Sequence, residues 1–168
     1  MKKIIMTAVV TFIMVFCMTG CGEEQDEFVD YINGGIKTEL GKLESQAKDS
    51  YASVTGDNAK DNETTLKELN TNTITLTKQA VEKATSLGDS IKGEKLKKTH
   101  AIYVSSLKNF QSGVELLIQV LQNDETDKIE QVTEFMNKAN EESSQYLTEI
   151  KKLAEELGVE FQSQDNSK

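Results

Sequence analysis

The feature that most constrains this chain is a pair of apolar stripes in which the spacing alternates between three and four residues. One stripe consists of Leu96, His100, Tyr103, Leu107, Phe110, Val114, Leu117 and Leu121. The other consists of Ile129, Val132, Met136, Ala139, Ser143, Tyr146, Ile150, Leu153 and Leu157. An alternation kept up over more than three heptads is typical of a helix that buries one seam. The two stripes therefore predict two long helices.

Two less regular stripes precede them. The first is Phe28, Ile32, Ile36, Leu40, Leu43, Ala47, Tyr51 and Val54. Gly34, Gly35 and Gly41 interrupt it, each weakening a helix by up to about 1 kcal/mol relative to Ala, so a bend near Gly34-Gly35 is expected. The second is Leu66, Leu69, Thr73, Leu76, Ala80, Ala84 and Leu87. Its part 72–77 alternates like a strand, but the chain beyond residue 20 offers no second alternating run, so a helix is predicted.

Glycine and capping residues mark the ends of these helices. The run 55–58 predicts a turn, after which Asp61 or Asn62 can cap the second helix. Gly88 suits the left-handed residue that closes this helix, and Gly93 suits the start of the next. Connections this short force neighbouring helices to run antiparallel.

We therefore expect an all-α fold, an antiparallel up-down-up-down four-helix bundle over residues 28–161. A flexible polar tail is expected over 162–168. The alternative is a three-helix arrangement with a loose second segment.

The start of the chain has the pattern of a secretory signal peptide. Lys2 and Lys3 are followed by fifteen residues, 4–18, that are apolar apart from two threonines. A helix that spans a membrane needs about 20 such residues, and this run ends in the small residues Thr19 and Gly20. Residues 1–20 are therefore predicted to be removed.

The cleavage region Met18-Thr19-Gly20-Cys21 resembles the lipobox of bacterial lipoprotein precursors, although Met18 stands where leucine is most common. The resemblance covers about the first 21 residues and identifies no family for the remainder. It implies that a diacylglyceryl group, with acyl chains such as palmitate, is joined to the Cys21 thiol. It also implies cleavage between Gly20 and Cys21. Cys17 does not compete, because the bulky Phe16 precedes it.

A lipidated Cys21 would place the protein on the extracytoplasmic face of the cell membrane. Each buried lipid CH₂ contributes about 0.8 kcal/mol, and two chains are enough for stable anchoring. Residues 21–27 would form a lipid anchor with a short acidic tether. All nineteen basic residues are lysine, a bias typical of AT-rich genomes that favours a Gram-positive source.

Composition argues against several other functions. A net charge of −9 argues against nucleic acid as a partner. The single histidine, His100, has Lys97 three residues before it, so the Glu-x-x-His pairs of di-iron bundles are missing. The segment 57–61 lacks the ligands and the glycine of a calcium loop. A serine triad would need His100 as its base, but His100 lies in a predicted seam. No catalytic residue, no metal and no cofactor beyond the lipid is therefore expected.

His100, Tyr103 and Tyr146 are the candidate binding residues. Counting from the loops places His100 in one layer with Ile32, Ala84, Tyr146 and Ile150. A buried histidine–tyrosine group could form a polar pocket or respond to pH. A lone seam histidine is more often hydrogen-bonded and inert, and this alternative stays open.

The function expected from these features is that of a non-catalytic binding or scaffolding module that contacts another envelope protein. One alternative is a small-ligand carrier or sensor with a site inside the bundle near Gly34, Gly35, His100 and Tyr146, which predicts an internal cavity. A second is a surface-exclusion or immunity lipoprotein, which predicts a contiguous apolar patch on the outside.

Overall fold

A computed structural model describes residues 13–17 and 22–163 of the chain. The predicted cleavage and lipidation positions, Gly20 and Cys21, lie outside the described residues. So do most of the predicted signal peptide and the last five residues of the predicted tail.

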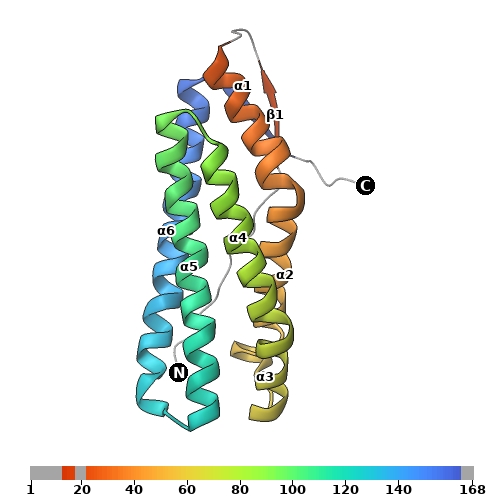
Figure 1. Cartoon of the computed structure of the whole chain (residues 1–168), viewed down its shortest axis with the longest axis vertical. Helices are drawn as coiled ribbons and strands as arrows, with labels where there is room; N and C mark the ends of the chain where they lie inside the picture. Colours follow the sequence, from red (N-terminus) through yellow and green to blue (C-terminus); the bar gives the residue numbers. More distant parts are fainter. Residues whose placement is uncertain (1–12, 18–21, 164–168) are drawn as a thin grey trace.

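Four helical segments pack side by side and form an elongated molecule (Figure 1). The first segment consists of α1 (Glu23–Asp30), the π-helical η1 (Tyr31–Leu40) and α2 (Gly41–Ala52). The second consists of α3 (Asn62–Glu68), the π-helical η3 (Leu69–Thr73) and α4 (Ile74–Ser90). The third is α5 (Glu94–Asn123) and the fourth is α6 (Ile129–Glu156), with short 3₁₀ turns η2 (Gly56–Asn58) and η4 (Thr126–Lys128) between segments. The predicted all-α class is confirmed, and residues 72–77 are helical as predicted.

One small pair of strands was not predicted. β1 (Ile13–Cys17) pairs antiparallel with β2 (Val159–Ser163), and Val15 lies opposite Phe161. β2 follows Gly158, whose φ of 65° ends the last helix. β2 lies beyond residue 20, where no further strand was expected, and its partner comes from the segment expected to be cleaved.

The stripes form two apolar clusters, one toward each end of the molecule. Phe28, Leu96 and Ile150 belong to the cluster beside α1, and Leu69, Phe110 and Val114 belong to the other. Stripe residues are buried in all four segments. Several others, such as Leu66, Leu87 and Leu121, are half-buried. Ile129 is the one exposed stripe residue, because it opens the first turn of α6 and remains 47% exposed.

The predicted helix ends are mostly confirmed. The Asp61 carboxylate accepts a hydrogen bond from the Thr64 backbone amide at 2.9 Å and caps α3. Gly93 is the N-cap of α5. The prediction for Gly88 was wrong, because α4 continues to Ser90 and Gly88 has no left-handed φ. A Cβ at Gly88 would lie 2.9 Å from His100 Cδ2, so close packing requires glycine there.

The predicted bend in the first segment lies within η1. Thr38 has non-helical angles, φ −78° and ψ −125°. Its hydroxyl donates to the carbonyls of Gly34 and Gly35 at 2.8 and 3.1 Å. The wider π-helical turn brings the Ile36 carbonyl close to Gly41, where an added Cβ would lie only 2.7 Å from that oxygen.

This geometry gives opposite predictions for two glycines of the same segment. Gly41→Ala should lower the free energy of unfolding by about 1–3 kcal/mol, because the new methyl group meets backbone. Gly34→Ala should raise it by up to about 1 kcal/mol, because nothing lies within 4 Å of the added Cβ and alanine favours helix. Urea unfolding followed by circular dichroism measures both. Equal effects of the two substitutions would contradict the described path of η1.

Candidate functional site

The three candidate residues lie together in the core. The ring centroids of His100 and Tyr103 are 6.0 Å apart, and those of Tyr103 and Tyr146 are 4.9 Å apart. His100 is 2% exposed, Tyr103 3% and Tyr146 5%. The predicted grouping is present, but none of these side chains can reach a ligand at the surface without movement.

Tyr31, which the sequence analysis did not select, connects two of them. Its hydroxyl lies 2.9 Å from His100 Nδ1 and 3.0 Å from the Tyr146 hydroxyl. His100 Nε2 lies 2.7 Å from the carbonyl oxygen of Ala84. These contacts form one continuous row of polar atoms, which we call the Tyr146–Tyr31–His100 chain.

The partners determine the direction of each hydrogen bond in this chain. A carbonyl oxygen can only accept, so Nε2 carries the hydrogen and donates to Ala84. The Nδ1 atom of a neutral imidazole then accepts, so Tyr31 donates to it. The Tyr31 oxygen is left to accept from Tyr146. Every polar atom of the Tyr146–Tyr31–His100 chain has a suitable hydrogen-bond partner only while His100 is neutral.

Burial also favours the neutral form of His100. Desolvation lowers the pKa of His100 below its ordinary value of 6.5, and the hydrogen bond to Ala84 opposes this only in part. Burial likewise raises the pKa of Tyr31 and Tyr146, so both hydroxyls keep their protons. The neutral arrangement is therefore the one present at pH 7.

Glu44 adds a charge to the same region. Its side chain is 4% exposed and accepts a hydrogen bond from the Tyr103 hydroxyl at 2.6 Å. Lys48, one helical turn later on α2, pairs with the other carboxylate oxygen at 2.5 Å. Burial and the neighbouring Glu44 raise the pKa of Tyr103. Among the described residues, no buried side-chain polar atom lacks a partner, so this core is fully paired.

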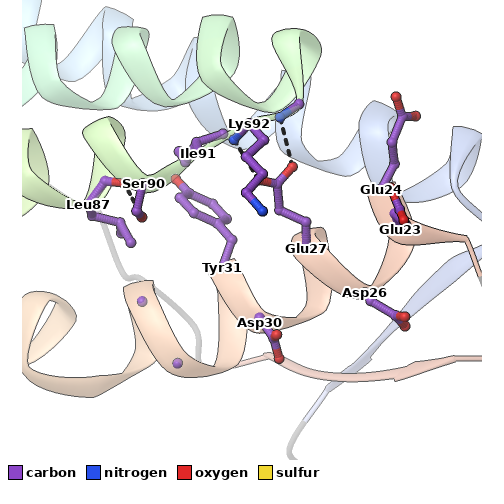
Figure 2. A pocket seen from close by; sticks show the side chains of 13 residues that line it. Glu23, Glu24, Asp26, Glu27, Asp30, Tyr31, Leu87, Ser90, Ile91 and Lys92 are labelled. Atoms are coloured by element: carbon purple, nitrogen blue, oxygen red, sulfur yellow. Dashed lines mark hydrogen bonds between the residues drawn. The ribbon is translucent and has the colours of Figure 1, made fainter.

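A pocket of about 860 Å³ opens beside this core, between the first helical segment and the turn that joins α4 to α5 (Figure 2). Its wall includes Tyr31, Gly34, Gly35 and Leu87. A Cβ at Gly35 would lie 2.8 Å from Leu87 Cδ2, so η1 and α4 are in close contact there. Five carboxylates also line the pocket: Glu23, Glu24, Asp26, Glu27 and Asp30.

Glu27 has a structural role in this wall. Its carboxylate accepts hydrogen bonds from the backbone amides of Lys92 at 2.6 Å and Gly93 at 2.8 Å (Figure 2). A carboxylate from α1 thus satisfies amides at the start of α5, where negative charge also suits the helix dipole. Residues 23–27, expected to belong to a tether, are the first residues of α1.

The pocket differs from the internal cavity that a ligand carrier would require. It contains Gly34 and Gly35 as that hypothesis expected, but His100 and Tyr146 are absent from its wall. Tyr31 faces the pocket and bonds to both of them. It therefore stands between the pocket and the buried pair.

Two residues of this region were missed for different reasons. Tyr31 precedes the stripe residue Ile32, and a stripe counted in steps of three and four selects only one of two neighbours, whereas both are buried. Glu44 is a carboxylate, a type that is rarely buried without a partner. Its local partner, Lys48, is spaced as in many exposed helix pairs, and the partner that meets it in the core, Tyr103, is 59 positions away.

Within residues 13–17 and 22–163, no group of three or more histidine, cysteine or carboxylate side chains is placed to hold a metal ion. No helix in this part of the chain is long and apolar enough to cross a membrane. Comparisons with protein-family models, curated proteins and solved structures find no match to the chain.

The Tyr103–Glu44 contact gives a stability prediction. Tyr103→Phe should lower the free energy of unfolding by about 1.5–3 kcal/mol, because a buried carboxylate loses a hydrogen-bond donor. In the double variant Y103F/E44M both partners are apolar, and Lys48, 17% exposed, can turn to water. The double variant should therefore be more stable than Y103F alone in chemical unfolding. A double variant that is less stable would show that the contact is not an isolated buried pair.

Proposed function

We propose that this protein is a lipid-anchored, extracytoplasmic binding module without catalytic activity, and that its acidic pocket receives a positively charged group of an envelope protein. The pocket beside the start of α1 carries the proposal, because it combines a cavity of about 860 Å³ with five lining carboxylates. Cavities of about 300–1,000 Å³ are the usual size of binding pockets. The lining holds one lysine, Lys92, against these five carboxylates, and a region with a net negative charge attracts a cation.

The anchor supports a location for this pocket close to the membrane. Cys21 precedes the first residue of α1, Glu23, by two positions. An extended residue spans at most about 3.6 Å, so a lipidated Cys21 would hold the start of α1 close to the headgroup layer. A partner that meets the pocket there is most simply another protein of the membrane surface.

The proposal includes an up-down-up-down order of the four helical segments. The short turns between segments support it, and Figure 1 draws the α5–α6 turn at the end opposite to the α4–α5 turn. In this order the start of α1, the end of α4 and the start of α5 share one end of the molecule. The lipid anchor and the pocket then belong to that end.

The described residues give the other hypotheses less support. A surface-exclusion protein would need an exposed apolar patch, yet Ile129 is the only large hydrophobic residue strongly exposed among the described residues. A hydrolytic mechanism would need His100 as a base, and both of its ring nitrogens are hydrogen-bonded in the core. A small cationic ligand remains the second candidate, because the pocket volume would accommodate one.

Replacement of the lipid acceptor tests the anchor. Cys21→Ala should leave an uncut precursor or release the protein into the medium, because no thiol remains at the cleavage site to take the lipid. Cys17→Ala is the matched control and should stay processed and membrane-bound. Cell fractionation and intact-mass measurement distinguish the outcomes. A C21A protein that is cut between Gly20 and position 21 and still retained on the membrane would refute lipid anchoring.

Carbodiimide cross-linking on intact cells tests the pocket, because it joins a carboxylate only to an amine in contact with it. We expect a partner protein to be linked through residues 23–30, and the variant E23Q/D26N/D30N to lose at least nine-tenths of this product. E130Q/E134Q/E141Q removes the same charge from exposed positions of α6 and should retain it. Equal yields from the two triple variants would show that the pocket is not the docking site.

A further inference from the structure

Tyr31 belongs to the pocket and to the core at once. It lines the pocket, while its hydroxyl donates to His100 and accepts from Tyr146. It is also the first residue of η1, the segment that contains Gly34, Gly35 and the bend at Thr38. A change at His100 is therefore one hydrogen bond away from the wall of the pocket.

Protonation of His100 is incompatible with the hydrogen bonds of the chain. A protonated ring donates from both nitrogens, so Tyr31 would have to accept from Nδ1 instead of donating to it. Tyr31 would then have to donate to Tyr146. Among the described residues, Tyr31 is the only hydrogen-bond partner of the Tyr146 hydroxyl, so the proton on Tyr146 would be left without an acceptor.

The surroundings of His100 offer no compensating charge. From α4 it meets the Ala84 carbonyl and Gly88, and from η1 it meets the neutral hydroxyl of Tyr31, which in turn bonds to the neutral hydroxyl of Tyr146 on α6. Tyr103 on its own helix separates it from the pair formed by Glu44 and Lys48 on α2. Desolvation lowers the pKa of His100, which agrees with a site that cannot stabilise a cation.

The direction of movement also follows from the packing. On the α4 side, the His100 ring lies so close to Gly88 that an added Cβ there would come within 2.9 Å. On the opposite side, Tyr31 borders an open pocket. Tyr31 and η1 are therefore the neighbours of His100 that have room to move.

We propose that the Tyr146–Tyr31–His100 chain is a proton-operated latch on the pocket. With His100 neutral, the chain holds Tyr31 and η1 against the core; with His100 protonated, Tyr31 is released and η1 moves away from α4. The consequence for binding rests on the function proposed for the pocket. The latch itself acts in the ligand-free protein and is tested there.

The sign of the pH effect follows from the lowered pKa. An unfolded chain binds a proton at His100 near pH 6.5, whereas the folded chain binds it only at lower pH. The contribution of His100 to stability is therefore constant above about pH 6.5 and declines as the pH falls toward the folded-state pKa. His100 is the only histidine, so no other imidazole titrates in this window.

Nuclear magnetic resonance on the ligand-free mature protein, titrated from pH 7.5 to pH 5, tests the latch. The His100 ring and the backbone amides of Gly34 and Gly35 should shift together, with one common midpoint below pH 6.5. In His100→Gln the neutral amide can donate to Ala84 and accept from Tyr31, so the shifts of Gly34 and Gly35 should lose at least four-fifths of their amplitude.

Tyr31→Phe is the second variant, and it keeps the test decisive if H100Q does not fold. Without the hydroxyl that bonds the neutral ring, the His100 midpoint should rise, and Gly34 and Gly35 should no longer follow it. If the amides titrate in H100Q as in the wild type, the lining carboxylates cause the shift and the latch is refuted. If His100 titrates while Gly34 and Gly35 stay still in the wild type, it is refuted as well. Neither result bears on the cross-linking test of the pocket.

Discussion

Polar atoms can be buried between helices only if every donor finds an acceptor, and the most demanding case in this molecule is the hydroxyl of Tyr31. Its oxygen lies 2.9 Å from Nδ1 of His100 on α5 and 3.0 Å from the hydroxyl oxygen of Tyr146 on α6. It has to donate a hydrogen bond to the first and accept one from the second. A fixed position for this hydroxyl fixes the distance of η1 from both helices. Ala84 on α4 completes the set through the other nitrogen of His100. One connected group of hydrogen bonds therefore links all four helical segments near one end of the molecule.

A second polar contact reinforces the same end. Glu27 on α1 accepts two backbone amides at the turn before α5, so the first segment is attached to the third from outside the core as well as inside it. The pocket lies between these two attachments, with Tyr31 and Glu27 both in its wall. Its shape thus depends on residues whose own positions are set by hydrogen bonds.

The helices could be predicted because their signal is local and repeated. The stripe that contains Leu107 and Val114 needs only a count of three and four, and the Asp61 cap needs only one turn of chain. The hydrogen-bonded contacts of the site could not be predicted in the same way. Tyr31 is buried beside Ile32, although a count in steps of three and four selects only one of them, and Glu44 is buried where Tyr103 reaches it from another helix. His100 was selected as a residue in a seam, but its partners depend on the relative height of four helices, which the spacing of apolar residues leaves open.

The protonation state of His100 tests the central claim most directly, since the whole polar core requires a neutral ring with its hydrogen on Nε2. Nitrogen chemical shifts of ¹⁵N-labelled histidine at pH 7 report each ring nitrogen separately. The account predicts an unprotonated Nδ1 and a protonated Nε2 whose hydrogen exchanges slowly with water. A hydrogen on Nδ1, or a cationic ring, would contradict the arrangement in which Tyr31 joins the pocket to the core.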